Sequence, residues 1–116
     1  MKSLELEKQI AVLQLVYQLI VSADGCMNEQ RDNVAIDFAL SELGYKPEGL
    51  GGNVGNMIWN KATEANPFEA FSIVSHLDNN IKMKFKDMIL RIAAMGGNKL
   101  FRQDIARQIF IRTRIN

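Results

Sequence analysis

The stretch VYQLIVSADGCMNEQRD, residues 16–32, decides the fold, because an apolar segment gives way there to a polar one across a glycine. Upstream, apolar residues recur at three- and four-residue steps over residues 4–22, which predicts a broad-faced, largely buried helix. Gly25 predicts the end of that helix, since glycine adopts the left-handed C-cap conformation without steric cost. Asn28 predicts the N-cap of a second helix over residues 28–43, because its side-chain oxygen can accept a first-turn N–H. The stretch therefore predicts a helix, a glycine turn and a second helix.

The rest of the chain is also helical in pattern. Residues 49–56, GLGGNVGN, lack a preceding strand and a following Gly-Lys-Ser/Thr, so they predict a flexible connection rather than a phosphate loop. Further helices are predicted over residues 54–64, from Pro67 onward, over 80–95 and over 99–114. Because no segment alternates with period two, residues 1–116 are expected to form a single compact all-α bundle of about six helices. The side chains predicted to face its core include Val34, Ala35, Phe38, Ala39, Met57, Trp59, Phe68, Phe71, Phe101 and Ile105.

A weak internal repeat links the two ends of the chain. Residues 16–25 and 88–97 match in apolar phase, with Ile20 over Ile92 and Gly25 over Gly97. Residues 34–39 then match residues 105–110 if the second loop is one residue shorter. The match predicts two helix-turn-helix halves with weak pseudo-twofold similarity, although any two amphipathic helix pairs can match in this way.

Composition is that of an ordinary soluble globular protein, with 47% hydrophobic and 23% charged residues. The single cysteine, Cys26, cannot form an internal disulfide, so nothing indicates an oxidising compartment. The apolar run over residues 11–23 is broken by Gln14 and Gln18 and is shorter than the roughly 20 residues of a membrane span. We therefore expect a cytoplasmic protein without a membrane-spanning segment.

Charge is distributed unevenly along the chain. Residues 1–81 carry five Lys or Arg against eleven Asp or Glu, a balance of −6, whereas residues 82–116 carry nine against two, a balance of +7. Region 82–114 is thus a candidate surface for an anionic partner, either nucleic acid or anionic lipid. Its candidate contact residues are Lys99, Arg102, Arg107, Arg112 and Arg114. A solvated face is favoured over this alternative, because the positive residues spread around two helices without a nucleic-acid reading motif.

The residues around Gly25 resemble the motif of a known family. Ala23-Asp24-Gly25 followed by Met27 and Asn28, with VAIDFALSELG at residues 34–44, resembles the TerB-like family, named for a tellurite-resistance protein. The resemblance implies an all-helical fold with the motif repeated in its second half. It also implies a role in bacterial stress response and tellurite resistance, divalent cations bound by the acidic residues of the Asp-Gly turns, and no enzymatic activity.

The sequence departs from the family pattern at charged positions. Arg31 stands where the resemblance expects a glutamate, and Gly96-Gly97 stands where it expects the second Asp-Gly pair. By helical phase, the second expected glutamate falls on Arg102. Asp24 alone keeps an acidic side chain among these four positions.

A cation site at this turn would use the oxygens of Asp24, Asn28, Glu29 and Asp32. Calcium takes about six to eight such oxygen ligands. Asn28 and Glu29 already have a structural role at a helix start, and Arg31 would place a positive charge inside the cage and repel a divalent ion. We therefore expect a structural turn with no metal or other cofactor, and keep divalent-cation binding through Asp24 as the alternative.

Catalysis has no visible residue set. His76, the single histidine, has no partner that the sequence identifies, and no base lies near Cys26. Glu29 and Asp32 share a helix face, but carboxylates at a helix start are expected to be solvated or capping. The sequence therefore predicts a non-enzymatic helical scaffold or interaction domain whose partner is a protein rather than nucleic acid. Binding to an anionic partner through residues 82–114 remains the second alternative.

Overall fold

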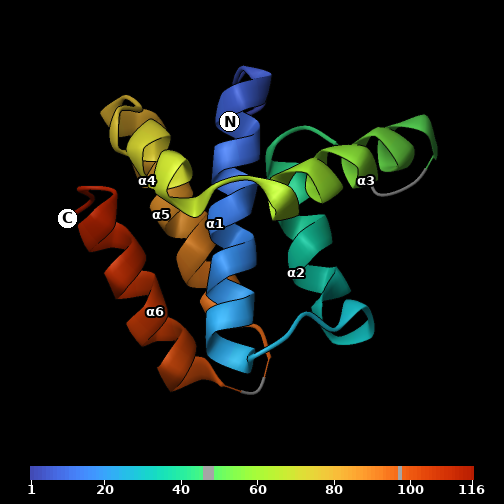
Figure 1. Cartoon of the computed structure of the whole chain (residues 1–116). Coiled ribbons are helices and arrows are strands. Elements are labelled where there is room, and N and C mark those ends of the chain that lie inside the picture. The colour runs from blue at the N-terminus through green and yellow to red at the C-terminus, as the bar shows by residue number, and fades with distance from the viewer. Residues whose placement is uncertain (46–48, 97) are drawn as a thin grey trace.

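The computed structural model describes residues 1–45, 49–96 and 98–116, and within them the side chains of all residues except Glu29 and residues 49–53. These residues form an all-α bundle, as predicted (Figure 1). Its elements are α1 (Leu6–Asp24), α2 (Glu29–Glu42), α3 (Gly49–Glu64), α4 (Pro67–Ser75), α5 (Asn79–Ala93) and α6 (Lys99–Arg112). Apart from the start of α3, the predicted helix ends lie within two residues of the observed ones, the range over which helix ends fray.

Helix α1 is the centre of the bundle and contacts all five other helices (Figure 1). Its buried apolar side chains point in several directions, since the fully buried Leu13 and Leu15 are two positions apart and lie on nearly opposite sides of the helix. A helix that is apolar all round is stable only when neighbours cover it. Each buried aliphatic side chain contributes about 1.5–3 kcal/mol to the free energy of folding. None of the helices within the described residues has the length and apolar character needed to cross a membrane.

Polar groups within α1 are satisfied inside the bundle. The buried Gln14 amide donates a hydrogen bond to the carbonyl of Ala62 in α3, and Gln18 donates to the Gln14 oxygen at 2.7 Å. Next to them, the rings of Tyr17 and Trp59 meet edge to face with centroids 6.3 Å apart. These contacts explain how two glutamines interrupt the apolar run without exposing the helix, since a buried amide is costly only when it is unpaired.

The glycine-rich segment 49–56 does not form the predicted connection, because α3 already begins at Gly49. At Gly55 a Cβ atom would lie only 3.4 Å from the side chains of Leu40 and Tyr45. The absence of a side chain at Gly55 leaves room for the side chains of Leu40 and Tyr45, which favours glycine there despite its low helix propensity. Pro47, which the sequence predicts to follow the end of the helix over residues 28–43, lies outside the described residues.

Four side chains predicted to face the core are instead exposed. Val34, Met57, Phe68 and Phe101 are each more than half exposed to solvent. In each helix the buried stripe runs through neighbouring positions, as in α2, where it runs through Ala35, Ile36, Ala39, Leu40 and Leu43. Each residue along a helix rotates the side chain by about 100°, so a stripe centred between Ala35 and Ile36 leaves Val34 on the opposite, solvent-facing side. The other predicted core positions, such as Ala35 and Trp59, are buried or half-buried.

Gly25 ends α1 as predicted, with φ of 82° and its N–H donating to the carbonyl of Val21 at 2.8 Å. A Cβ atom at Gly25 would meet no other atom within 4 Å, so a substitution there costs only conformational energy. We expect Gly25→Ala to lower the free energy of unfolding by about 1–2 kcal/mol, the cost of the left-handed conformation for an L-residue. Gly25→Asn should lose less, because asparagine tolerates this conformation. Urea denaturation of both variants measures the difference in their free energies of unfolding. Equal losses would contradict the assignment of Gly25 as a left-handed C-cap.

Candidate functional site

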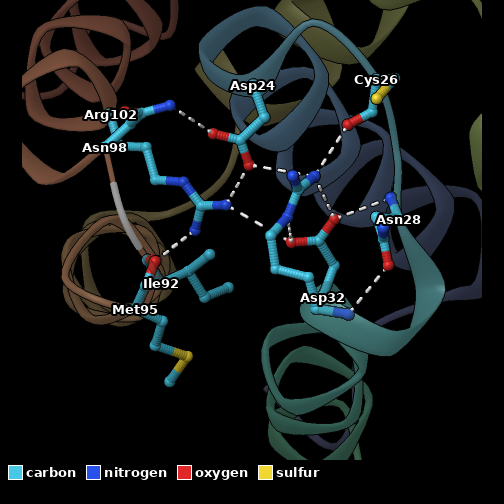
Figure 2. A network of polar contacts seen from close by, with 9 residues as sticks. Asp24, Cys26, Asn28, Asp32, Ile92, Met95, Asn98 and Arg102 are labelled. Carbon is cyan, nitrogen blue, oxygen red and sulfur yellow. Dashed lines mark hydrogen bonds and ion pairs between the residues drawn. The ribbon is translucent and has the colours of Figure 1, made fainter.

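Asp24 is the last residue of α1 and lies beside the start of α6. Its side chain is only 5% exposed and accepts hydrogen bonds from Arg102 and, at 3.3 Å, from the Asn98 amide (Figure 2). The guanidinium of Arg31 lies 3.4 Å from the same carboxylate. A carboxylate at a helix C-terminus is disfavoured by the helix dipole, so these positive partners are what stabilise it there.

Asp32, in the first turn of α2, is the second buried carboxylate, with a side chain 2% exposed. It accepts the backbone N–H of Asn28 at 3.0 Å, while the Asn28 side chain accepts the backbone N–H of Arg31 at 3.1 Å (Figure 2). The two residues therefore cap the helix reciprocally, in the manner of a capping box with its acidic residue one position later. The Arg31 side chain donates to both carboxylate oxygens, at 3.1 and 2.9 Å.

Arg102 reaches the same place from α6, with a side chain only 2% exposed. It binds the Asp24 carboxylate and lies 3.4 Å from an oxygen of Asp32. Its other terminal nitrogen donates to the carbonyls of Ile92 and Met95 at the end of α5 (Figure 2). One guanidinium therefore links α6 to the ends of α1 and α5 and the start of α2.

The turn before α6 is shaped around this guanidinium. Gly96 has φ of 95°, and a Cβ atom there would lie 3.3–3.4 Å from the guanidinium of Arg102. Both the backbone conformation and the close approach favour glycine at this position. Gly97, which the repeat places over Gly25, lies outside the described residues, and the pseudo-twofold relation stays a prediction.

Asp24, Arg31, Asp32 and Arg102 together form what we call the Asp–Arg cluster, two carboxylates and two guanidiniums of zero formal charge. Burial alone would raise the pKa of Asp32, but the hydrogen bonds from Arg31 and from the Asn28 N–H, with the charges of both arginines, lower it overall. The hydrogen bond to Asp32 raises the pKa of Arg31 above its ordinary value. Both shifts favour the ionised pair. Arg31, whose side chain is 39% exposed, covers the cluster on its solvent side.

The structure brings together two of the four residues of the alternative cation site. Asp24 and Asp32 both face the cluster, but their oxygens accept N–H groups of Arg31 and Arg102. The Asn28 side-chain oxygen is used as the helix cap. The Glu29 side chain lies outside the described residues. Among the residues that are described, no three His, Cys, Asp or Glu side chains form a group that could hold a metal ion.

One expectation about charged residues was wrong. Arg102 was placed on a surface for anionic partners, yet its side chain is buried. Asp32 was expected to be solvated or capping, and it caps the helix by accepting the Asn28 N–H from a buried position. The helical phase carried a signal for Arg102, because it lies four and seven positions before the buried Ala106 and Ile109. A charged residue at a core position needs a buried counter-charge. Nothing in the sequence identified which carboxylates supply it.

The remaining candidates for an anionic partner are exposed but have different surroundings. Arg107 pairs with Asp104 at 2.9 Å, and Arg112 lies over the ring of Phe71 at 5.3 Å. Lys99 lies in the first turn of α6 and Arg114 just beyond its end. An exposed pair such as Arg107 with Asp104 contributes little to stability, about 0–1 kcal/mol. Without Arg102, these four residues span the whole length of α6 rather than one compact patch.

His76 and Cys26 are the remaining candidates for catalysis. The one side chain that hydrogen-bonds His76 among the described residues is the adjacent Ser75, whose hydroxyl lies 3.2 Å from Nδ1. His76 is the C-cap residue of α4, and its Nδ1 lies 2.7 Å from the carbonyl of Ser72. His76 therefore has a structural role at the end of α4. Cys26 is exposed, and its carbonyl accepts a hydrogen bond from Arg31 at 3.0 Å.

The fold and the Asp–Arg cluster define an all-α bundle with a buried ion-pair cluster where α1, α2, α5 and α6 meet. Comparison with known proteins gives no match, whether with a family model, a curated protein or a solved structure. The TerB-like resemblance therefore rests on the residues quoted above and stays a prediction.

Proposed function

We propose that the protein is a small, non-enzymatic helical scaffold or interaction domain of TerB-like type, in which two arginines take the place of a divalent cation. The supporting observation is that Arg31 and Arg102 both bind the Asp24 and Asp32 carboxylates. Arg31 and Arg102 stand at the two positions where the resemblance expects glutamate. The proposal includes a cytoplasmic location and a protein partner, and the resemblance adds stress response as the setting.

Electrostatics explains why such a site would dispense with a metal. A cluster of carboxylates alone repels itself and is stabilised when a divalent ion binds. Here the two positive side chains already balance the two negative ones, and Arg102 is held further by the carbonyls of Ile92 and Met95. An incoming cation would have to displace both guanidiniums and would still be repelled by them. The cluster then links four helices permanently through buried ion pairs and hydrogen bonds.

Thermal unfolding with and without Ca²⁺, Mg²⁺, Mn²⁺ or Zn²⁺ tests this proposal. We expect the midpoint of the wild-type protein to stay constant, because an ion that does not bind the native state cannot stabilise it. A saturable rise in the midpoint that Asp24→Ala abolishes would contradict the proposal and support the alternative of a cation site at this turn.

Arg31→Glu provides the converse test, since it places a third carboxylate beside Asp24 and Asp32. We expect this variant to be less stable than wild type without cations and to recover when a divalent cation is added. At ten times the dissociation constant the gain is about 1.4 kcal/mol, or roughly 5–10 °C in midpoint for a domain of this size. Arg31→Gln is the matched control, because it removes the same positive charge without adding a ligand. Equal cation responses in the two variants would count against ligand binding at this turn.

A further inference from the structure

An apolar groove of about 310 Å³ lies between α1 and α4, which pack side by side (Figure 1). Its apolar lining consists of Leu6, Ile10, Ala11, Ala65, Ala70 and Ile73. Three of these six residues are alanines, whose short side chains leave the hollow between the two helices. The groove is therefore shaped to receive one or two apolar side chains from outside.

Two carboxylates flank the groove. Glu7 of α1 and Glu69 of α4 line it and are exposed to solvent. Neither forms an ion pair with any other residue that the structure describes. The groove thus combines an apolar floor with two free negative charges, a combination that fits an apolar side chain flanked by positive ones.

The outer face of α6 has the complementary pattern. Ile111 is 76% exposed, Arg107 precedes it by one helical turn, and Arg114 follows it in the turn that ends the helix. Both arginines are exposed, and the Arg107 pair with Asp104 is itself exposed, so Arg107 can exchange that partner at little cost. We refer to Arg107, Ile111 and Arg114 as the Ile111 ridge.

We propose that the α1–α4 groove receives the Ile111 ridge of a second copy of this chain. Ile111 would enter the alanine-lined hollow, and the two arginines would pair with Glu7 and Glu69, since guanidinium binds carboxylate with two hydrogen bonds. The charge asymmetry of the sequence agrees with this pairing. The groove belongs wholly to residues 1–81, with a balance of −6, and the ridge wholly to residues 82–116, with a balance of +7.

The ridge cannot fill the groove of its own chain. Helix α6 packs its opposite face, with the buried Ala106, Ile109 and Phe110, into the bundle against α1 and α5. Ile111 therefore faces solvent and reaches a groove only on another molecule. This inference goes beyond the proposed function and shares no residue with the Asp–Arg cluster, so either can fail without the other.

Sedimentation velocity of the full-length protein over a wide concentration range tests the contact. We expect the average mass to rise above that of the monomer with concentration, and the dissociation constant to weaken at high salt, where exposed ion pairs are screened. A wild-type protein that stays monomeric at every concentration in low salt would overturn the proposal. So would an association that strengthens as salt is added.

Charge exchange identifies the surfaces. Glu7→Arg with Glu69→Arg, and separately Arg107→Glu with Arg114→Glu, should each weaken self-association by at least about tenfold, because like charges then face each other. An equimolar mixture of the two double variants restores opposite charges at both contacts and should associate about as strongly as wild type. If the double variants associate as wild type does, or if the mixture fails to recover, the proposed surfaces are wrong.

Ile111→Glu is the apolar counterpart and has a matched control in Phe68→Glu. The two side chains are 76% and 75% exposed, but Phe68 does not line the groove or belong to the ridge. We expect at least about a tenfold loss of association for Ile111→Glu and wild-type association for Phe68→Glu. Equal effects would overturn the assignment of the ridge. Circular dichroism and the thermal midpoint of each variant show whether it has kept its fold.

Discussion

Replacing Arg102 with methionine is expected to lower the free energy of unfolding by about 3–5 kcal/mol, the typical cost of removing one partner of a buried ion pair. Asp24 and Asp32 have side chains only 5% and 2% exposed, and the loss of Arg102 leaves Arg31 as the one guanidinium in contact with them among the described residues. The carbonyls of Ile92 and Met95 lose a donor as well. Methionine replaces the aliphatic part of the side chain, so the loss comes mainly from charge and hydrogen bonds rather than from a cavity.

Urea denaturation at pH 7 measures this loss, with Arg91→Met as the matched control. Arg91 also pairs with an aspartate, Asp87 of the same helix, but at an exposed site, so its replacement should change stability by at most about 1 kcal/mol. Adding Asp24→Asn to Arg102→Met removes the one uncompensated negative charge and should recover part of the loss. A near-neutral Arg102→Met would mean that the cluster does not hold the helices together.

Replacing Asp32 with asparagine should lower the free energy of unfolding at pH 7 by about 3 kcal/mol. Asparagine has nearly the same shape but carries no charge, and it cannot accept two hydrogen bonds from Arg31 through two oxygens. The buried Arg102 would also lose one of its two carboxylate contacts. Asp37→Asn, at an exposed position of the same helix, is the control and should change stability little.

The effect of Asp32→Asn should depend on pH in a defined direction. The pKa of Asp32 is lowered in the folded protein from an ordinary value of 3.8. A group with a lowered folded pKa contributes stability that is fully present above its unfolded pKa and is lost as the pH falls through its folded pKa. The difference in the free energy of unfolding between wild type and variant should therefore stay constant in neutral solution and narrow below about pH 4. A gap that widens on acidification would contradict the cluster as described.

Local signals predicted most of the fold correctly. Gly25 and Asn28 ended and started helices because capping depends on the residue and its immediate neighbours. Asn66 likewise accepts the backbone N–H groups of Phe68 and Glu69 at 2.8 and 3.2 Å, with Pro67 in the first turn of α4. Such interactions span a few residues, so the sequence contains all the information that they require.

The candidate site depended on contacts that local patterns do not contain. Arg102 and Asp24 are 78 positions apart, and only the packing of α6 against α1 brings them together. Arg31 was correctly expected to place its charge among the acidic side chains, because it lies within the same turn. The exposed Phe101 was wrongly placed in the core for a related reason, since the neighbouring Arg102 takes the inward position.

The long sequence separation between Arg102 and Asp24 also affects the order in which the chain folds. Helices α1 and α2 leave the ribosome before α6 and can form their turn early, when Arg31 is the one member of the Asp–Arg cluster that can balance their two carboxylates. The second counter-charge, Arg102, arrives only with α6. Closing the cluster joins residues 78 positions apart, and a contact between such distant parts of the chain costs loop-closure entropy and slows folding. Because the closed cluster links the α1–α2 turn to α6, we expect these elements to unfold together as one cooperative unit.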